Sequence, residues 1–575
     1  MKQYRNLLAD VGFDYGDPDL PMVFGSETEF GFAYGKVLDG SRAYQFPATW
    51  PERVFPLIIK MAANNTGAFV RDPEKPWERE GLNHFETEEM KQIAKGAASG
   101  NVHCLPERIK NEILRIGISP EDFHLGQVGI NLPDGARLYI DGSHIEASTS
   151  ECRDPRQVVC LEKAMERIIY EAALQAQEIC GRQIFIFKNN TDGRGNSYGY
   201  HQNFALLRNF FEELLNEGSF WRQAWLSFII SDQIYTGGGK VGSEKGGKEC
   251  DYQISQRADH ISAVCGHDTM DKRPLINYRD EPLADRDKWG RLHVICGDSN
   301  MSEIATCLKI GAKALVLNML QHQYFTREKP DEYKNLFISD PVGAFKAISR
   351  DLTCQKPLLF TANGKKSALE IQKTWSAFLR NFYLHSFCRY RSPWIGEVVE
   401  KREQILKWTE KHDRILDSIL DWRIKRRMIK TYIRTGFKKR GQKITYQNEN
   451  VRTMDISYHD IGPDGFFNRY NQLGNVENLV GESDIQNYMG NSPENTRAWL
   501  RGQLIKHYPF YLTDIDWAMA SFPIIIGDFK DKIRLKMEPL GSTMDKVGDL
   551  FDGTKTFEQF CEQFVSLYLN RKENF

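Results

Sequence analysis

The sequence predicts a protein of the α+β class with more than one domain, and polar-faced strands together with long helical stretches support that prediction. Residues 21–35 and 136–151 alternate side chains as strands do when one face lies on a core. Apolar residues recur at helical spacing over 154–180, and residues 303–325 and 366–440 also have helical character. A chain of 575 residues exceeds what one hydrophobic core usually serves.

The segment 136–151 carries the richest set of reactive side chains. Arg137, Tyr139 and Asp141 are spaced two residues apart and therefore share one face of an extended chain, and Glu146 follows after a Gly-Ser-His turn. Mg²⁺ takes oxygen ligands and arginine binds phosphate oxygens, so this set suits an anionic substrate with a metal ion. An edge strand with a solvated polar face is an equally good interpretation of these residues alone.

Two further carboxylates, Glu27 and Glu29, share a face of the first predicted strand. They repel each other unless a cation lies between them, so we expect either a divalent metal ion or separate pairing with lysine or arginine. The Gly- and Asn-rich stretch 188–201 follows a short buried strand at 184–187 and ends in His201. This histidine is either a ligand or a satisfied polar residue.

Three more candidates, Arg257, Arg279 and His293, lie in separate short polar segments of strand or turn character. Guanidinium groups held in place there can clamp phosphoryl oxygens through two hydrogen bonds each. Ion pairs with the neighbouring Asp259 or Asp280 are the alternative.

Composition excludes several classes of protein. The 76 basic and 77 acidic residues give a net charge of −1, so nothing draws the chain as a whole to nucleic acid. No signal-peptide core and no apolar stretch long enough to span a membrane are present, and a cytoplasmic protein is expected. The eleven cysteines include no Cys-x-x-Cys pair, which argues against a disulfide framework and a thiolate zinc site.

Six ordered motifs spread over most of the chain resemble the Pup ligase and Pup deamidase/depupylase family. They are Ser26-Glu-Thr-Glu-Phe-Gly, Ala136-Arg-Leu-Tyr-Ile-Asp-Gly-Ser-His-Ile-Glu, Lys188-Asn-Asn-Thr-Asp with Asn196-Ser-Tyr-Gly-Tyr-His, Ser255-Gln-Arg-Ala-Asp, Arg291-Leu-His-Val-Ile-Cys-Gly-Asp-Ser-Asn-Met-Ser-Glu, and Thr496-Arg-Ala-Trp-Leu-Arg-Gly. The resemblance implies a carboxylate-amine ligase fold, with a glutamine-synthetase-like antiparallel active-site sheet packed with helices and a small C-terminal domain.

We therefore expect a catalytic domain over 1–440 and a C-terminal domain over 441–575 that contributes to the nucleotide site. A long insertion over 36–130, with helices near 86–98 and 106–116, follows the first active-site strand and is expected to control access. The resemblance implies ATP and Mg²⁺ as cofactors. It implies as partners a small ubiquitin-like modifier, Pup or Pup-like, and its lysine-linked conjugates. It leaves the oligomeric state open.

Carried over position by position, the resemblance assigns a role to eleven residues. Those implied to bind Mg²⁺ are Glu27, Tyr139, Glu146 and His201. Those implied to contact ATP or its terminal phosphate are Arg137, Thr149, Arg257, Arg279, His293 and Trp517. Asp141 falls at the position of the catalytic aspartate, and Arg257, Arg279 and His293 are expected to support the reaction by stabilising charge.

The chain departs from the family pattern at two places, because Gln202 stands for a glutamate and Ile145-Glu-Ala for Pro-Glu-Tyr. Gln202 is the one hint of a nucleotide-sensing protein without turnover. An ATP-dependent small-molecule carboxylate-amine ligase is a further alternative.

The branch within the family is predicted from five features. The long separation of Glu27 from Asp141, the Gly-Ser-His directly after Asp141 and the segment 534–543 resemble the deamidases. Gly195-Asn-Ser-Tyr-Gly and Gly297-Asp-Ser-Asn resemble the ligases. We expect a deamidase or depupylase that acts on the modifier's C-terminal Gln or Glu, with conjugation of that Glu to protein lysines as the alternative.

Overall fold

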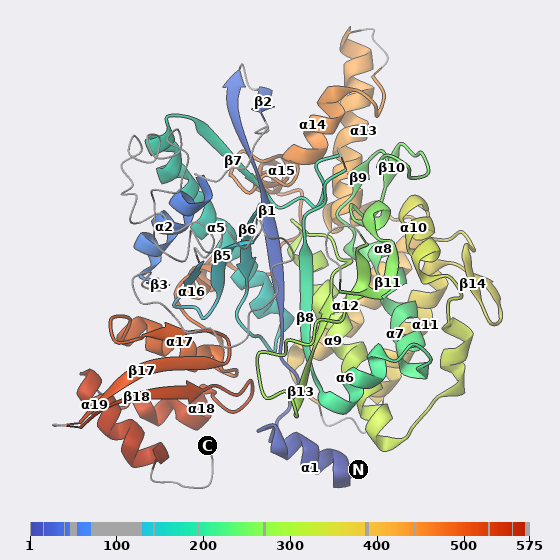
Figure 1. The fold of residues 1–575 in the computed structure, drawn as a ribbon. Helices are drawn as coiled ribbons and strands as arrows, with labels where there is room; N and C mark the ends of the chain where they lie inside the picture. Colours follow the sequence, from blue (N-terminus) through green and yellow to red (C-terminus); the bar gives the residue numbers. More distant parts are fainter. Residues whose placement is uncertain are drawn as a thin grey trace, which may run out of the picture.

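A sheet of eleven strands runs through the centre of the protein, with helices on both sides, as the computed structural model shows (Figure 1). The structure describes residues 2–14, 16–38, 41–45, 54–70, 129–141, 144–193, 195–267, 272–385, 390–440, 444–526, 529–554 and 556–569. The order of the main path is β11-β12-β13-β8-β1-β6-β5-β4-β3, with β2 and β7 paired to β1. All described pairs in this sheet are antiparallel except β11 with β12.

The strands of this sheet are β1 (Phe24–Leu38), β2 (Ser41–Gln45), β3 (Phe69–Val70), β4 (Gly129–Asn131), β5 (Arg137–Asp141), β6 (His144–Ser148), β7 (Gln183–Phe187), β8 (Tyr200–Leu207), β11 (Ala263–Gly266), β12 (Pro274–Asn277) and β13 (Trp289–Val294). The strands predicted at 21–35 and 184–187 are confirmed as β1 and β7. The segment predicted at 136–151 forms two paired strands, β5 and β6, rather than one.

One face of the sheet is covered by α5 (Pro155–Cys180), the helix predicted at 154–180. Asp154 caps its first turn by accepting a hydrogen bond from the Arg156 backbone, and Gly181, with φ of 61°, ends it in the left-handed conformation. Helix α2 (Val54–Thr66) packs along α5 and shares its apolar core. Within the insertion at 36–130, the structure describes the elements β2, α2 and β3. The helices predicted near 86–98 and 106–116 lie outside the described residues.

Beside β8 and β13 lies a second, larger group of helices built around α9 (Glu303–Thr326), whose residues are buried along most of its length (Figure 1). The helical stretches predicted at 303–325 and 366–440 are confirmed here, the second as several helices. The helices of this part are α1 (Lys2–Asp10), α6 (Arg208–Leu215), α7 (Phe220–Ser231), α8 (Gln233–Thr236), α10 (Pro341–Arg350), α11 (Ala368–Arg380), α12 (Pro393–Glu410), α13 (Asp421–Arg440), α14 (Glu449–Ser457) and α15 (Phe466–Gln472). Two hairpins, β9 (Lys240–Val241) with β10 (Tyr252–Gln253) and β14 (Leu359–Thr361) with β15 (Gly364–Lys366), complete it. Helix α16 (Glu482–Tyr488) packs on α5 instead (Figure 1).

The C-terminal elements form a unit with its own hydrophobic core, drawn in red in Figure 1. They are α17 (Ala498–His507), β16 (Asp514–Ile515), β17 (Met519–Ile526), β18 (Phe529–Lys536), α18 (Met544–Val547) and α19 (Phe557–Phe564). The predicted α+β class is confirmed, whereas the domain boundary at residue 440 stays a prediction. None of the helices in the described part of the chain is long and apolar enough to cross a bilayer.

Candidate active site

One cavity of about 1350 Å³ is lined by all eleven residues that the sequence singled out. They are Glu27, Arg137, Tyr139, Asp141, Glu146, Thr149, His201, Arg257, Arg279, His293 and Trp517. The cavity opens on the face of β1, β5, β6, β8 and β13 that lies opposite α5, and the C-terminal unit closes one end with Trp517. Residues far apart in the chain therefore meet in a single site.

Strand register explains why these side chains meet. Glu27 pairs with His201 across β1 and β8, and Glu29 pairs with Glu146 across β1 and β6. Tyr139 pairs with Glu146 across β5 and β6. Directly paired residues point to the same face of a sheet, so all five face the cavity.

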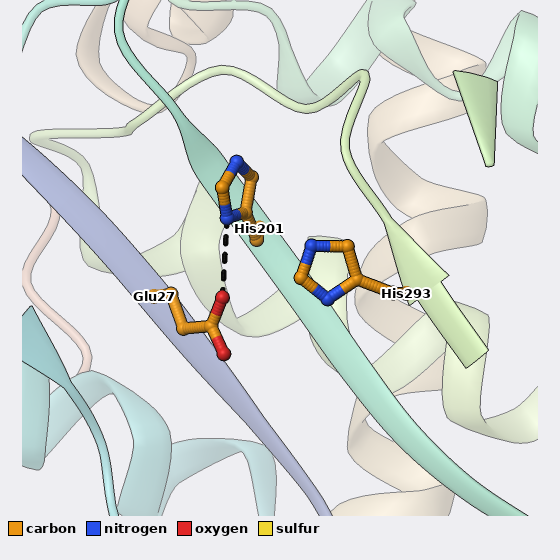
Figure 2. A group of neighbouring side chains, drawn as sticks. All are labelled: Glu27, His201 and His293. Atoms are coloured by element: carbon orange, nitrogen blue, oxygen red, sulfur yellow. Dashed lines mark hydrogen bonds and ion pairs between the residues drawn. The ribbon is translucent and has the colours of Figure 1, made fainter. Parts of the chain in front are cut away.

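Glu27, His201 and His293 form the first group, on three adjacent strands (Figure 2). One potential ligand atom from each lies within 4.8 Å of the others. His201 Nδ1 lies 3.1 Å from Glu27 Oε2, and the two imidazole rings are 4.8 Å apart. Asn203 holds the group together, since its amide donates to Glu27 Oε1 at 3.0 Å and its oxygen lies 2.8 Å from His293 Nδ1.

The protonation states of Glu27 and His293 suit the binding of a cation by this first group. Burial alone would raise the pKa of Glu27, but hydrogen bonding to His201 and the charge of Arg291 hold that pKa well below its usual range. Burial lowers the pKa of His293 well below its usual value, so this imidazole is neutral. With Nδ1 directed to Asn203, Nε2 of His293 keeps a lone pair that suits a metal ion.

The second group is Glu29, Asp141 and Glu146, whose carboxylate oxygens also lie within 4.8 Å of one another. Burial, then the charges of Glu27 and Glu29, raise the pKa of Glu146 well above its usual value. Partial burial and the charge of Glu29 raise the pKa of Asp141. Carboxylates this close repel unless a cation compensates them, and hard divalent ions take such oxygen ligands. Both groups therefore fit divalent metal ions.

Tyr139 and Arg137 lie together beside the second group. The Arg137 guanidinium stacks 5.1 Å from the Tyr139 ring. Burial and the charge of Glu146 raise the pKa of Tyr139, so the phenol stays protonated. Thr149, at the end of β6, accepts a hydrogen bond from the Ser26 backbone at 3.0 Å and is buried against the cavity wall.

The ion-pair alternative for Arg257 is wrong. Its neighbour Asp259 pairs instead with Arg350. Arg257 is 2 % exposed and donates to the Tyr198 carbonyl, and burial lowers its pKa to about 10, so it remains charged at neutral pH.

The same alternative is wrong for Arg279, because Asp280 pairs with Arg208 at 2.9 Å and with Arg286 at 2.8 Å. Within the described chain, the buried Nε atoms of three arginines on the cavity lack a hydrogen-bond partner: Arg137, Arg257 and Arg291. Guanidinium groups that line a cavity suit an anionic ligand such as a phosphate chain.

The C-terminal unit reaches the cavity through Trp517. The Arg501 guanidinium lies 4.7 Å from the Trp517 ring and donates to the Trp517 carbonyl at 3.2 Å. Arg501 and Arg497 both bind the buried carboxylate of Glu151, which follows β6. The indole is thereby held against the central sheet, with one face engaged by a guanidinium.

Both departures from the family pattern fall on the far side of the sheet. Gln202 is fully buried between His201 and Asn203, which face the cavity, and Ala147 lies in the core beneath α5. The substitutions therefore leave the cavity-facing side chains in place. Three residues that contact the two groups were not among the eleven assigned a role: Glu29, which shares the predicted face with Glu27, Arg291, which begins one of the six motifs, and Asn203, which no sequence signal marked.

Comparison with known proteins gives a consistent result. The family model described as Pup-ligase protein matches residues 22–521. The chain belongs to the Pup-ligase family. It is similar to the depupylase of Acidothermus cellulolyticus, with 32 % identity over 83 % of this chain and 89 % of that protein. It is also similar to the Pup--protein ligase of Saccharomonospora viridis, with 36 % identity over 73 % of this chain and 89 % of that protein.

The family assignment agrees with a solved structure. The Pup ligase PafA in complex with ADP aligns with a TM-score of 0.62 and 27 % identity, over 83 % of this chain and 96 % of that chain. The chain is thus an enzyme of the Pup ligase/depupylase family with the expected glutamine-synthetase-like fold. The resemblance seen in the six sequence motifs is confirmed.

Proposed function

We propose that this protein is an ATP- and Mg²⁺-dependent enzyme that acts on the C-terminal Gln or Glu of a Pup-like modifier, in the direction of deamidation and isopeptide cleavage. One observation carries the proposal: Asp141, at the rim of the cavity, lies against Glu29 and Glu146 in a cavity that is also lined by Arg137, Arg257 and Arg279. A basic carboxylate, a cation site and an anion site thus adjoin one another.

In this proposal Arg137, Arg257 and Arg279 hold the phosphate chain of ATP, and the face of Trp517 turned from Arg501 packs on the base. Mg²⁺ bound there would neutralise the charge of the phosphates and act as a Lewis acid in the reaction. Glu27, Glu29 and Glu146 supply oxygen ligands for it, and His201 and His293 are the nitrogen donors available.

Asp141 is the proposed catalytic carboxylate. In hydrolysis it acts on the amide or isopeptide carbonyl, directly or through a water molecule whose proton it accepts, and ammonia or the lysine amine leaves. In ligation it takes a proton from the incoming lysine amine, which attacks a glutamyl phosphate and releases phosphate. Its raised proton affinity, caused by burial and Glu29, suits either role.

The insertion after β1 favours the hydrolytic branch. Helix α2 of this insertion brings Phe55 to the cavity wall, so the insertion contributes to the site itself. The similarity to the depupylase also extends over more of this chain than the similarity to the ligase, 83 % against 73 %. Conjugation remains the second candidate, favoured by the higher identity to the ligase, 36 % against 32 %, and by the ligase-like motifs at Gly195 and Gly297.

One mass-spectrometric experiment separates the two. The protein is incubated with ATP and Mg²⁺ in three parallel reactions: Pup ending in Gln, Pup ending in Glu with a lysine-bearing protein, and a purified Pup–lysine conjugate. We expect hydrolysis of the C-terminal Gln to Glu in the first, in which water replaces ammonia, and release of the free protein in the third. A conjugate formed in the second reaction, with no change in the other two, would establish the ligase direction. No change in any of the three would reject the proposed function.

A further inference from the structure

On the face of the sheet away from the cavity, one carboxylate is hydrogen-bonded to both β1 and β8, the strands that carry Glu27 and His201. Glu162 of α5 is 6 % exposed. Its Oε1 accepts hydrogen bonds from Ser26 Oγ and from Tyr200 Oη, each at 2.7 Å. We propose that Glu162 is a positioning residue, which sets the relative placement of the metal ligands Glu27 and His201 through these two neighbours.

The strand register supports this role. Ser26 precedes Glu27 on β1, Tyr200 precedes His201 on β8, and the two antiparallel strands pair Glu27 with His201. Because side chains alternate between faces, Ser26 and Tyr200 flank that pair diagonally on the back of the sheet. A single oxygen bonded to both hydroxyls therefore fixes the offset between the strands at the point where the metal ligands project.

The carboxylate is itself held rigidly. Glu162 Oε2 accepts from Lys188 Nζ at 3.2 Å, Lys188 also binds Glu166 at 2.6 Å, and Lys163 binds Glu166 at 3.1 Å. Two acids and two bases give a neutral, hydrogen-bonded network, which is the condition for burying charges. Lys188 also begins the loop that leads to His201, so the same network anchors that loop.

A role limited to neutralising Lys188 is the competing explanation, and two substitutions separate it from positioning. Glu162→Asp keeps the charge but draws the carboxylate back by about 1.5 Å, one C–C bond, so that it cannot reach both hydroxyls. Glu162→Gln keeps the reach and an acceptor oxygen but removes the charge. Positioning predicts that the Asp variant is the worse metal binder, and charge compensation predicts the opposite.

The test rests on the proposed metal-dependent function and uses Mn²⁺ as the probe. Mn²⁺ is titrated into the full-length protein without nucleotide, free Mn²⁺ is followed by electron paramagnetic resonance, and thermal unfolding is recorded in parallel. We expect Glu162→Asp to raise the Kd for Mn²⁺ roughly tenfold, as loss of outer-shell support commonly does, and Glu162→Gln to raise it less. Glu166→Asp, one helical turn away in the same network but bonded only to Lys163 and Lys188 in the described structure, is the matched control and should bind like the wild type.

Three results would overturn the inference: wild-type affinity in Glu162→Asp, a larger loss in Glu162→Gln, or an equal loss in Glu166→Asp. If Glu162→Asp does not fold, Ser26→Ala and Tyr200→Phe each remove one of the two hydrogen bonds. Both should weaken Mn²⁺ binding, and wild-type affinity in both would refute positioning. Absence of Mn²⁺ binding by the wild type would reject the proposed metal dependence as well, whereas the other outcomes bear on Glu162 alone.

Discussion

Neutralising Glu151 is expected to loosen the C-terminal unit from the central sheet. The carboxylate accepts from Arg497 Nε at 2.6 Å and from both terminal nitrogens of Arg501. Burial alone would raise the pKa of Glu151, but the two arginines hold it at about 2 against an ordinary value of 4.5. That difference corresponds to about 3 kcal/mol of stabilisation at neutral pH.

The same magnitude follows from the geometry. Removing one partner of a buried ion pair costs roughly 3–5 kcal/mol, because the remaining charge is left without compensation. Here each arginine keeps two backbone carbonyl acceptors after Glu151→Gln, which places the expected cost at the lower end of that range.

Hydrogen exchange with mass spectrometry measures this cost locally. In Glu151→Gln, amides of α17 should exchange roughly a hundredfold faster at neutral pH, while α9 keeps its protection. The folded-state pKa of Glu151 lies below its unfolded value, so its stabilisation is complete above pH 4.5 and is lost as pH falls toward 2. The difference between variant and wild type should therefore shrink over that interval.

Glu403→Gln is the control for the Glu151 experiment, since Glu403 pairs with the partly exposed Arg380 at 2.5 Å and should cost about 1 kcal/mol or less. Unchanged protection of α17 in Glu151→Gln, or a change no larger than in the control, would refute the reasoning.

Three further predictions concern the cavity itself. Asp141→Asn should lower turnover by roughly 10²–10⁴-fold with ATP affinity retained, and turnover within about threefold of wild type would assign the chemistry elsewhere. Glu27→Ala and Glu146→Ala should each weaken Mg²⁺-dependent ATP binding in calorimetry, because each removes an oxygen ligand; unchanged affinity in both would contradict the metal assignment. Trp517→Ala should weaken nucleotide binding without altering thermal unfolding, and equal affinity would exclude Trp517 as the base platform.

Alternation along strands made much of the site predictable from the sequence. Period-two spacing placed Glu27 with Glu29 and Arg137 with Asp141 on common faces, and the structure puts all four on the cavity. Helix α5 was equally predictable, because apolar residues recur at helical spacing over most of its length.

Contacts between distant segments were not readable from pattern. Asn203 bridges Glu27 and His293, but that role exists only because β8 lies between β1 and β13. Likewise, Glu162 looks like an ordinary helix residue until Ser26, 136 residues away, is seen to bond to it. Pairing order across a sheet depends on the whole chain, and local periodicity carries no information about it.

Charged side chains lie on both faces of β1 and β8, but only those behind the sheet form a neutral network among themselves. This difference indicates that ligands bind in front. Behind the sheet, two acids and two lysines satisfy one another, so nothing further is needed. In front, the acids Glu29, Asp141 and Glu146 lie within 4.8 Å of one another, and arginines line the same cavity. An anion that carries its own divalent cation complements both kinds of charge at once, because its phosphates meet the arginines while its metal ion meets the carboxylates. ATP with Mg²⁺ is such a ligand. The same strands thus carry a neutral, hydrogen-bonded network on one face and the proposed binding groups on the other.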